Sequence, residues 1–506
     1  MKYVFFILLV FGLTAPIKSV FGSDVRVVVM ADMGNEPDEM QQMVHLLMYS
    51  NEIDLQGLIA VSGYALHSKR QRKDGTFGKV HPEMFLELID AYAKVFDNLK
   101  LHADGWHTPK YLRSIVRHGT SDFGSKAVGP GMETPGSKLV AGILAKDDPR
   151  PVYFVGNAGT NTLAQALRDL HESRSDSQMD QICEKIIVYE NRAQDDCGVW
   201  ITLRYPSIRW YRSIQQTYAY GGLRSRGGPQ GPYTWEPYPR TYRGQHEWAE
   251  EHVMNDHGAL GELYPYRMRP PGNAFIEGGG TCPWIGLANT GLWDPLNMHW
   301  GGWGGRFSSR KYSNQDVIPY GKDMWSNRAT IIASEKRQAK GKSFAMFLAD
   351  TEIESWTDPV HGEVFESHMV PIWRWRRAMF SDFRARMDWC VKSRSEANHN
   401  PVAAVNGDTT NTIVTLNVQP EQDLKLDGSA TVDPDGDDVA FRWWIYPEAG
   451  TYQGGIKLSP QDADQLIFDV PKDAAGKQIH VILEVKDGNS EVPLYDYRRI
   501  VLNVNE

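Results

Sequence analysis

The sequence predicts an α/β domain with a mostly parallel sheet and helices on both faces, followed by a small all-β sandwich. Apolar, β-branched runs alternate with helical patterns over the first 400 residues, as in parallel sheets. After residue 400 the pattern changes to short alternating strands with acidic turns. The charge changes at the same place: residues 401–506 have 8 Lys and Arg against 18 Asp and Glu, whereas residues 1–400 carry a formal charge of +1.

The N-terminus has the pattern of a secretory signal peptide. Lys2 precedes a ten-residue apolar run, Val4 to Leu13, and small residues follow around Ser23. The run is too short to span a bilayer comfortably, although an uncleaved anchor is the alternative. We expect residues 1–22 to be removed, the mature chain to be secreted or periplasmic, and no stable membrane insertion to remain.

The first exported segment predicts a central strand followed by a helix. Residues 25–30 (VRVVVM) are apolar on both faces, which is typical of a buried parallel strand. A helix is expected over 37–50, because Pro37 suits its first turn and an apolar stripe follows. Further strands are expected at 57–61, 151–155 and 185–189, and a helix at 163–170. Ligands bind such sheets where the carboxyl ends of the strands meet the following loops.

Residues 200–330 contain nine of the sixteen Trp and show little periodicity. We interpret them as aromatic loops that cover the carboxyl edge of the sheet, with a ligand-free packing layer as the alternative. Helical patterning returns over 363–391. We therefore assign residues 23–397 to the α/β domain.

Residues 398–506 predict an immunoglobulin-like sandwich, because about 100 residues carry short strands such as 441–445 and 480–485. The residues from Asp433 to Asp438 are typical of a turn, and they lack the spacing of an EF-hand. The four cysteines would permit three disulfide pairings, and they lack the CxxC spacing of a zinc site. The composition, 23% charged with a net charge of −9, shows no basic patch, so we expect no nucleic-acid partner.

The loop from Asp32 to Glu39 is the strongest candidate for chemistry. It places four carboxylates, those of Asp32, Glu36, Asp38 and Glu39, between a central strand and a helix. Such carboxylates repel one another unless a cation lies among them, and Ca²⁺ binds through oxygens. One of them could deprotonate water. A solvated helix start is the alternative.

Two other loops follow predicted strands. Asn157 lies in a Gly-rich loop whose carbonyls could bind a cation, and the loop lacks the GxGxxG and P-loop patterns. Asp195 and Asp196 follow the strand at 185–189, with a simple turn as the alternative. No GxSxG elbow or cysteine-protease signature occurs.

Together these residues resemble nucleoside hydrolases, and more closely the bacterial secreted family described as cellulose-binding and nucleoside-hydrolase-like. The residues that carry the resemblance are DMGNEPD (32–38), GNAGTNTLAQAL (156–167), QDDCGVWI (194–201), WGGWGGR (300–306) and the stretch from NHNPVA through DPDGDD to WWIYPEAGTY (398–452). The resemblance spans nearly the whole mature chain, and it is specific as a set.

The resemblance implies a nucleoside-hydrolase-like fold and a Ca²⁺ site. Asp32 and Asp38 match the metal-binding aspartates, Asp32 also matches the general base, and Asn157 matches the position whose backbone carbonyl contributes to the metal. The sequence departs from the nucleoside hydrolase pattern at Glu39, which replaces an Asp. It departs also at Tyr64, where Asn is usual, and around Glu277, where glycines stand in place of a late Asp.

We expect a hydrolase that acts on a glycosyl bond of a carbohydrate or polysaccharide. The catalytic candidates are Asp32, Asp38, Asp195 and Asp196, the last two as possible acids. The substrate-binding candidates are Asn35, Glu36, Asn157, Trp200, Trp300 and Trp303. We expect at least two exposed rings among these tryptophans and Trp293, because aromatic rings stack on sugars. The alternatives are a non-catalytic polysaccharide-binding protein with a degenerate site and a cell-surface scaffold.

Overall fold

The computed structural model describes residues 25–63, 79–221, 231–269, 273–276, 278–289, 291–316, 329–350 and 352–506. The predicted signal segment 1–22, Tyr64 and Glu277 lie outside the described residues. Within the described residues no helix is both long and apolar enough to cross a membrane.

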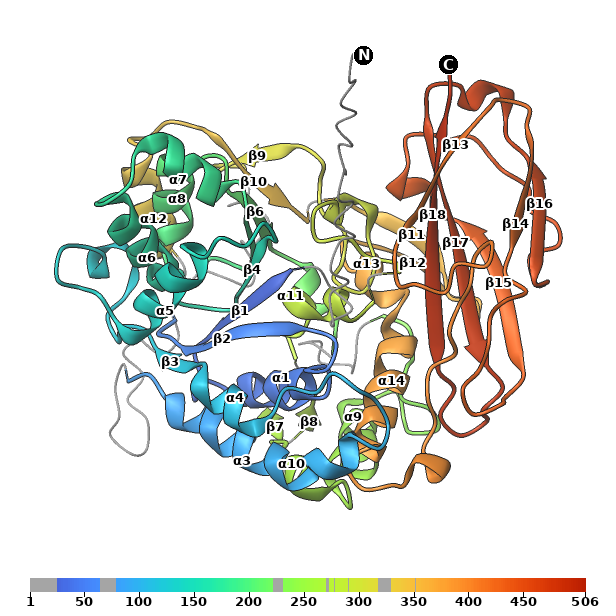
Figure 1. The fold of residues 1–506 in the computed structure, drawn as a ribbon, viewed down its shortest axis with the longest axis horizontal. Helices are drawn as coiled ribbons and strands as arrows, with labels where there is room; N and C mark the ends of the chain where they lie inside the picture. Colours follow the sequence, from blue (N-terminus) through green and yellow to red (C-terminus); the bar gives the residue numbers. More distant parts are fainter. Residues whose placement is uncertain are drawn as a thin grey trace, which may run out of the picture.

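The described part of the first domain is built on an eight-stranded sheet (Figure 1). Neighbouring strands are parallel, except that β9 runs antiparallel to β10. In spatial order the strands are β3 (Val116–His118), β2 (Asp54–Ala60), β1 (Arg26–Ala31), β4 (Val152–Gly156), β5 (Ile186–Asn191), β6 (Arg209–Ser213), β10 (Ala345–Ala349) and β9 (Lys311–Ser313).

Strand β1 is apolar apart from Arg26 because both faces of the sheet are covered. Val27 and Val29 belong to one core, and Val28 and Met30 belong to the core on the opposite face. Alternate side chains of a strand point to opposite faces, so both sets must be apolar. The predicted α/β sheet with helices on both faces is therefore confirmed.

The helices form two layers, which Figure 1 shows on either side of the sheet. One layer contains α5 (Pro135–Leu144), α6 (Asn161–His171), α7 (Asp176–Cys183), α8 (Cys197–Arg204) and α12 (Ala329–Gln338). The other contains α1 (Pro37–Leu47), α3 (Pro82–Leu99), α4 (Pro109–Ser114), α9 (Tyr242–Ala249), α10 (Gly258–Glu262), α11 (Cys282–Ile285), α13 (Val370–Trp373) and α14 (Arg376–Asp388).

The predicted elements 25–30, 37–50, 57–61, 151–155, 163–170 and 185–189 correspond to β1, α1, β2, β4, α6 and β5 within a few residues. The prediction of helix from residue 363 was wrong at its start. A hairpin of β11 (Glu354–Thr357) and β12 (Val364–Ser367) precedes α13, with Pro359 and Gly362 in its turn. A further small sheet pairs β7 (Arg267–Arg269) with β8 (Asn273–Phe275).

The C-terminal region forms two packed sheets, as predicted. One sheet has the order β13 (Val414–Val418), β18 (Tyr495–Val504), β17 (Gln478–Asp487) and β15 (Val439–Ile445), and the other pairs β14 (Asp423–Asp427) with β16 (Gln465–Asp469). Leu426, Leu466 and Leu483 meet in the sandwich core. The backbone N–H groups of Asp435 and Asp437 donate to Asp433 Oδ1, so the acidic run makes a turn.

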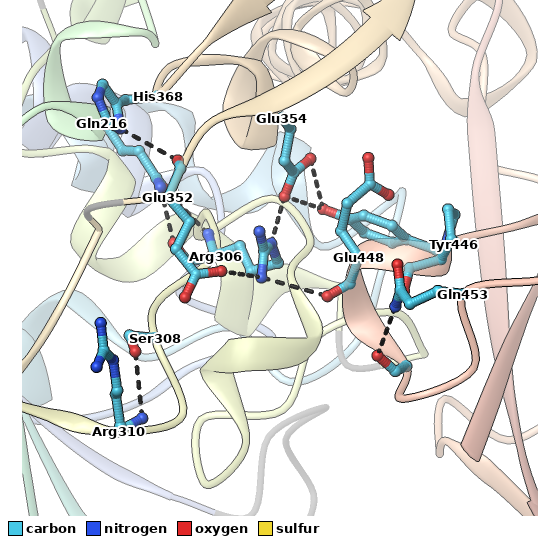
Figure 2. Close-up of polar contacts among 12 residues, drawn as sticks. Gln216, Arg306, Ser308, Arg310, Glu352, Glu354, His368, Tyr446, Glu448 and Gln453 are labelled. Carbon is cyan, nitrogen blue, oxygen red and sulfur yellow. Dashed lines mark hydrogen bonds and ion pairs between the residues drawn. The ribbon is translucent and has the colours of Figure 1, made fainter. Parts of the chain in front are cut away.

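The two domains share one apolar core. Ile482 and Tyr497 lie on the outer face of the larger sandwich sheet and pack with Trp375 of the first domain. Glu354 at the start of β11 joins the domains: it accepts hydrogen bonds from Tyr446 Oη (3.1 Å), Arg374 Nη2 (2.6 Å) and Arg306 Nε. Figure 2 shows Glu354 between Arg306 and Tyr446.

All four cysteines are buried free thiols. They are Cys183, Cys197, Cys282 and Cys390, and none of the three possible pairings forms. The cysteines therefore act here as small apolar residues of the cores rather than as crosslinks.

Candidate functional site

Asp32 and Asn157 meet at the carboxyl edge of the sheet because β1 and β4 are neighbouring parallel strands. Asp32 directly follows β1, and Asn157 directly follows β4. The backbone N–H of Asn157 donates to Met30 O (3.0 Å), which ties the second loop to the end of β1. Strand β2 ends on the other side of β1 and leads to Gly63.

The carboxylate of Asp32 is buried and held tightly. It is 1% exposed, and Asn35 donates both its backbone N–H to Asp32 O and its Nδ2 to Asp32 Oδ2, each at 3.0 Å. A Cβ at Gly63 would lie 2.4 Å from Asp32 Oδ2, so only glycine fits there. Asp32 Oδ1 is buried and accepts no hydrogen bond from the protein.

The carboxylates of Asp32, Asp38 and Glu39 interact with one another at this edge of the sheet. Burial, and then repulsion from Asp38, raises the pKa of Asp32 to about 7. Burial, and then repulsion from Asp38 and Asp32, holds the pKa of Glu39 well above its ordinary value. Glu39 also accepts a hydrogen bond from Glu36 N (3.2 Å), as in a capping box at the start of α1. The loop thus concentrates negative charge, and it also begins a helix.

Asn157 is fixed by two residues that sequence reasoning missed. Its Nδ2 donates to Gln42 Oε1 on α1 (2.6 Å) and to Gly280 O (3.4 Å). A Cβ at Gly280 would lie 2.2 Å from Gln42 Oε1, so the glycine lets this amide approach. Asn157 Oδ1 is buried and accepts no hydrogen bond from the protein. The sequence signal that could have identified Gln42 was its polar side chain beside the apolar stripe of α1.

The oxygen atoms at this edge of the sheet are of the type that a hard cation binds. Asp32 Oδ1 and Asn157 Oδ1 are buried oxygens without protein partners, and Ca²⁺ takes oxygen ligands. Over the described ranges, no group of three or more His, Cys, Asp and Glu side chains has the arrangement of a metal centre. A cation here would therefore depend on amide and backbone oxygens as well as on carboxylates.

Asp195 is placed as a structural group. It accepts hydrogen bonds from Thr160 Oγ1 (2.5 Å), Asn161 N (3.0 Å) and Cys197 N (2.9 Å), which join the starts of α6 and α8. Burial raises its pKa to about 7. Since donors occupy both oxygens, its surroundings do not support the expected role as a catalytic acid.

The Asp196 carboxylate is also held by several hydrogen bonds. It accepts hydrogen bonds from Ser125 N (2.6 Å), Gln338 Nε2 (2.9 Å) and Ser334 Oγ, which come from two distant segments. A Cβ at Gly124 would lie 2.4 Å from Asp196 Oδ1, so the loop around Gly124 is fitted closely to this carboxylate. These contacts anchor α12 to the loop before α8.

We expect Asp195→Asn to lower stability and to leave the function of the folded protein unchanged. The amide replaces one acceptor oxygen with an NH₂ group that faces N–H donors, and a lost buried hydrogen bond costs about 1–3 kcal/mol. Urea unfolding measures the first effect, and turnover or glycan affinity per folded molecule measures the second. Wild-type stability together with lost turnover would instead make Asp195 catalytic.

The expectation of exposed tryptophan rings was wrong for the four that we singled out. Trp293 and Trp303 are 1% and 3% exposed and lie in the shared core. Trp300 is half-buried against His480 of the sandwich, and Trp200 is half-buried on α8 beneath Arg204.

Close glycines explain why Trp293 is buried. Cβ atoms at Gly286, Gly302 and Gly304 would lie 2.5, 2.9 and 2.6 Å from its side chain. Gly302 and Gly304 of the 300–306 run therefore pack around a tryptophan. By contrast, Asn35 and Glu36 remain half-buried beside Asp32, where a ligand could reach them.

Comparisons with known families match both parts of the chain. Residues 26–307 match the family described as "Cellulose-binding Sde182, nucleoside hydrolase-like domain". The chain belongs to this family. Residues 423–504 match the "Cellulose-binding protein Sde0182, C-terminal domain", so the second domain belongs to the same architecture.

A solved structure supports the family membership over almost the whole chain. It is described as a nucleoside hydrolase-related hypothetical protein from Saccharophagus degradans that is associated with carbohydrate metabolism. The two chains share 32% identity with a TM-score of 0.76, and the match covers 95% of this chain and 100% of the other. The comparison with curated proteins finds no match.

Proposed function

We propose that this family member is an exported hydrolase that cleaves glycosyl bonds of a polysaccharide, with Asp32 as the general base. The observation that carries the proposal is the buried Asp32 carboxylate, with one unpartnered oxygen at the carboxyl edge of a nucleoside-hydrolase-like sheet. A base with a pKa near the working pH is the most effective, and the pKa of Asp32 is raised to about 7. The cellulose-binding description of the family supports a polysaccharide substrate and an extracellular location.

In the proposed reaction, water attacks the anomeric carbon through an oxocarbenium-like transition state, the bond from that carbon to the oxygen of the leaving sugar breaks, and that oxygen takes a proton from solvent water. Asp32 accepts the proton of that water, while Asn35 holds Asp32 Oδ2 in place. Asp32, Asp38 and Asn157 would hold Ca²⁺, which would supply positive charge and lower the pKa of water. Incubation of the protein with neutral polysaccharides, with Ca²⁺ or a chelator, tests the proposal through release of reducing ends.

We expect calcium to stabilise the folded protein at neutral pH and to reverse a loss of stability caused by rising pH. Without metal, folded Asp32 holds a proton up to a pKa of about 7, whereas the unfolded carboxyl releases it near 3.8. The folded state therefore binds more protons between these values, and stability in chelator falls as the pH rises through this window. At pH 7.5, Ca²⁺ at 100 times its Kd would add about 2.7 kcal/mol.

Urea unfolding of wild type and Asp32→Asn, in calcium and in chelator, measures both effects. The variant should lose the calcium response and this part of the pH dependence. Asp97→Asn, in an exposed ion pair with Lys100, is the matched control and should respond like wild type. An equal calcium response in wild type and Asp32→Asn would place the cation elsewhere.

The second candidate function is polysaccharide binding without catalysis. Two observations favour it: the carboxylates of the described residues do not converge as a metal centre, and Asp195 and Asp196 are held by structural donors. In that case Asp32→Asn should bind glycans as well as the wild type does, and neither the variant nor the wild type should release reducing ends from any glycan.

A further inference from the structure

An aromatic cleft of about 450 Å³ lies between the two domains, remote in sequence from the Asp32 loop. It is formed where β11 and the region of α13 and α14 face β15, β17 and β18 of the sandwich, and Figure 1 shows these elements side by side. Its aromatic lining consists of Trp356, Trp373, Trp375, Trp444, Tyr495 and Tyr497. The volume falls within the roughly 300–1,000 Å³ of small-ligand pockets.

The rings form a layer with buried supports and partly exposed surfaces. Trp375 and Tyr497 are 1% and 2% exposed and lie beneath the half-buried Trp444 and Tyr495. Trp375 lies 5.6 Å from Trp444 at 36°, and Tyr497 lies 6.4 Å from Tyr495 at 6°, measured between ring centroids and planes. Supported rings of this kind present a rigid apolar face at low entropic cost, which suits the C–H face of a pyranose ring.

Polar atoms without partners are concentrated in the same lining. Nε1 of Trp373, Nε1 of Trp375 and Nε1 of Trp444 are buried donors with no hydrogen-bond partner in the protein, and the same holds for Arg374 Nε. Glu448 Oε2 is a buried acceptor without a partner. Buried polar groups are almost always satisfied, so these atoms indicate a ligand with both donors and acceptors. Hydroxyl groups supply both.

The charges of the cleft are nearly balanced. Four cationic and three anionic side chains line it: Arg374, Arg377, Arg442, Lys486, Asp358, Glu448 and Glu484. They are partly paired, since Arg442 lies 3.6 Å from Glu484 on the neighbouring strand of the sandwich and Arg374 lies 3.8 Å from Glu448 of the other domain. The sandwich domain as a whole is strongly acidic. A balanced cleft on an acidic domain favours a neutral ligand over a polyanion.

We propose that this interdomain cleft binds a segment of a neutral polysaccharide chain. Trp444, Trp356 and Tyr495 stack against sugar rings, and the indole N–H groups of Trp373 and Trp444 and the carboxylate of Glu448 bond to their hydroxyls. The sugar class rests on the proposed function, whereas the location is independent of the Asp32 site. The first domain and the sandwich thus hold the chain jointly, and neither domain contains the whole cleft.

Calorimetric titration of the full chain with cellohexaose tests this cleft. We expect Trp444→Ala and Trp356→Ala each to weaken binding about tenfold or more, as for a central aromatic contact. Trp444→Phe keeps a ring and should recover part of the affinity. Tyr266→Ala removes an exposed ring outside the cleft and should bind like wild type. Circular dichroism and thermal melts establish that each variant is folded.

The outcomes separate the cleft from the Asp32 site. Affinity lost in the folded Trp variants but kept in Asp32→Asn supports the cleft, whether or not the protein has turnover. Wild-type affinity in both folded Trp variants overturns it. Tighter binding of an alginate oligosaccharide than of cellohexaose overturns the assignment to neutral chains.

Discussion

Replacing Asp32 with Asn should lower the rate of glycosyl-bond hydrolysis by 10²–10⁴-fold, the usual effect of losing a general base. The substitution keeps the shape of the side chain and its packing against Gly63 and Asn35. It removes the lone pair that accepts the proton and the charge that attracts a cation. The measurement is the rate of reducing-end release from a neutral glycan, at saturating substrate and with Ca²⁺ present.

Asp38→Asn is the informative comparison for Asp32→Asn. Asp38 is half-buried and raises the pKa of Asp32 by repulsion. Because Asp38 would also hold Ca²⁺ in the proposed site, its loss should lower the rate and weaken the calcium response. The remaining activity should have a pH profile shifted to lower pH, because the base then loses its proton more easily. Equal rates in wild type and Asp32→Asn would remove Asp32 from the mechanism.

Replacing Glu354 with Gln should destabilise the protein by about 3–5 kcal/mol, because it leaves the buried guanidinium groups of Arg306 and Arg374 without their main partner. The Glu354 side chain is 0% exposed, and those of Arg306 and Arg374 are 7% and 5% exposed. Glu352 and Glu448 lie 3.2 and 3.8 Å from these arginines and would offset part of the loss. We therefore expect the lower end of the range.

Urea unfolding followed by tryptophan fluorescence measures this effect, and limited proteolysis shows whether the domains separate. Glu363→Gln is the matched control. Glu363 pairs with Arg240 at the surface, with side chains 40% and 48% exposed, and such pairs contribute about 0–1 kcal/mol. Equal unfolding midpoints for the two variants would show that the Glu354 cluster does not hold the domains together.

Local patterns predicted the fold and the position of Asp32 and Asn157. Both residues follow strands that are apolar on both faces, and parallel strands bring their carboxyl ends to one edge. The sequence could not show that the carboxylates of Asp195 and Asp196 accept hydrogen bonds that hold the structure together. The donors to Asp196, such as Ser125 and Gln338, come from segments more than 70 and 140 residues away.

The aromatic residues were the least predictable. Composition places tryptophans in loops, but it does not show which rings are enclosed by close glycines, as Trp293 is by Gly302 and Gly304. The interdomain cleft assembles Trp356, Trp375 and Trp444 from both domains. Its only local signals were the WRW and WW runs at 373–375 and 443–444, and neither indicates a partner.

The most direct test of the proposed function is mass spectrometry of a defined neutral oligosaccharide after incubation with the wild-type protein and Ca²⁺. Hydrolysis predicts paired products whose masses add up to that of the substrate plus one water, formed by wild type and nearly absent with Asp32→Asn. An oligosaccharide that is bound but remains intact, across the neutral glycans tested, would contradict the hydrolase and leave a binding protein.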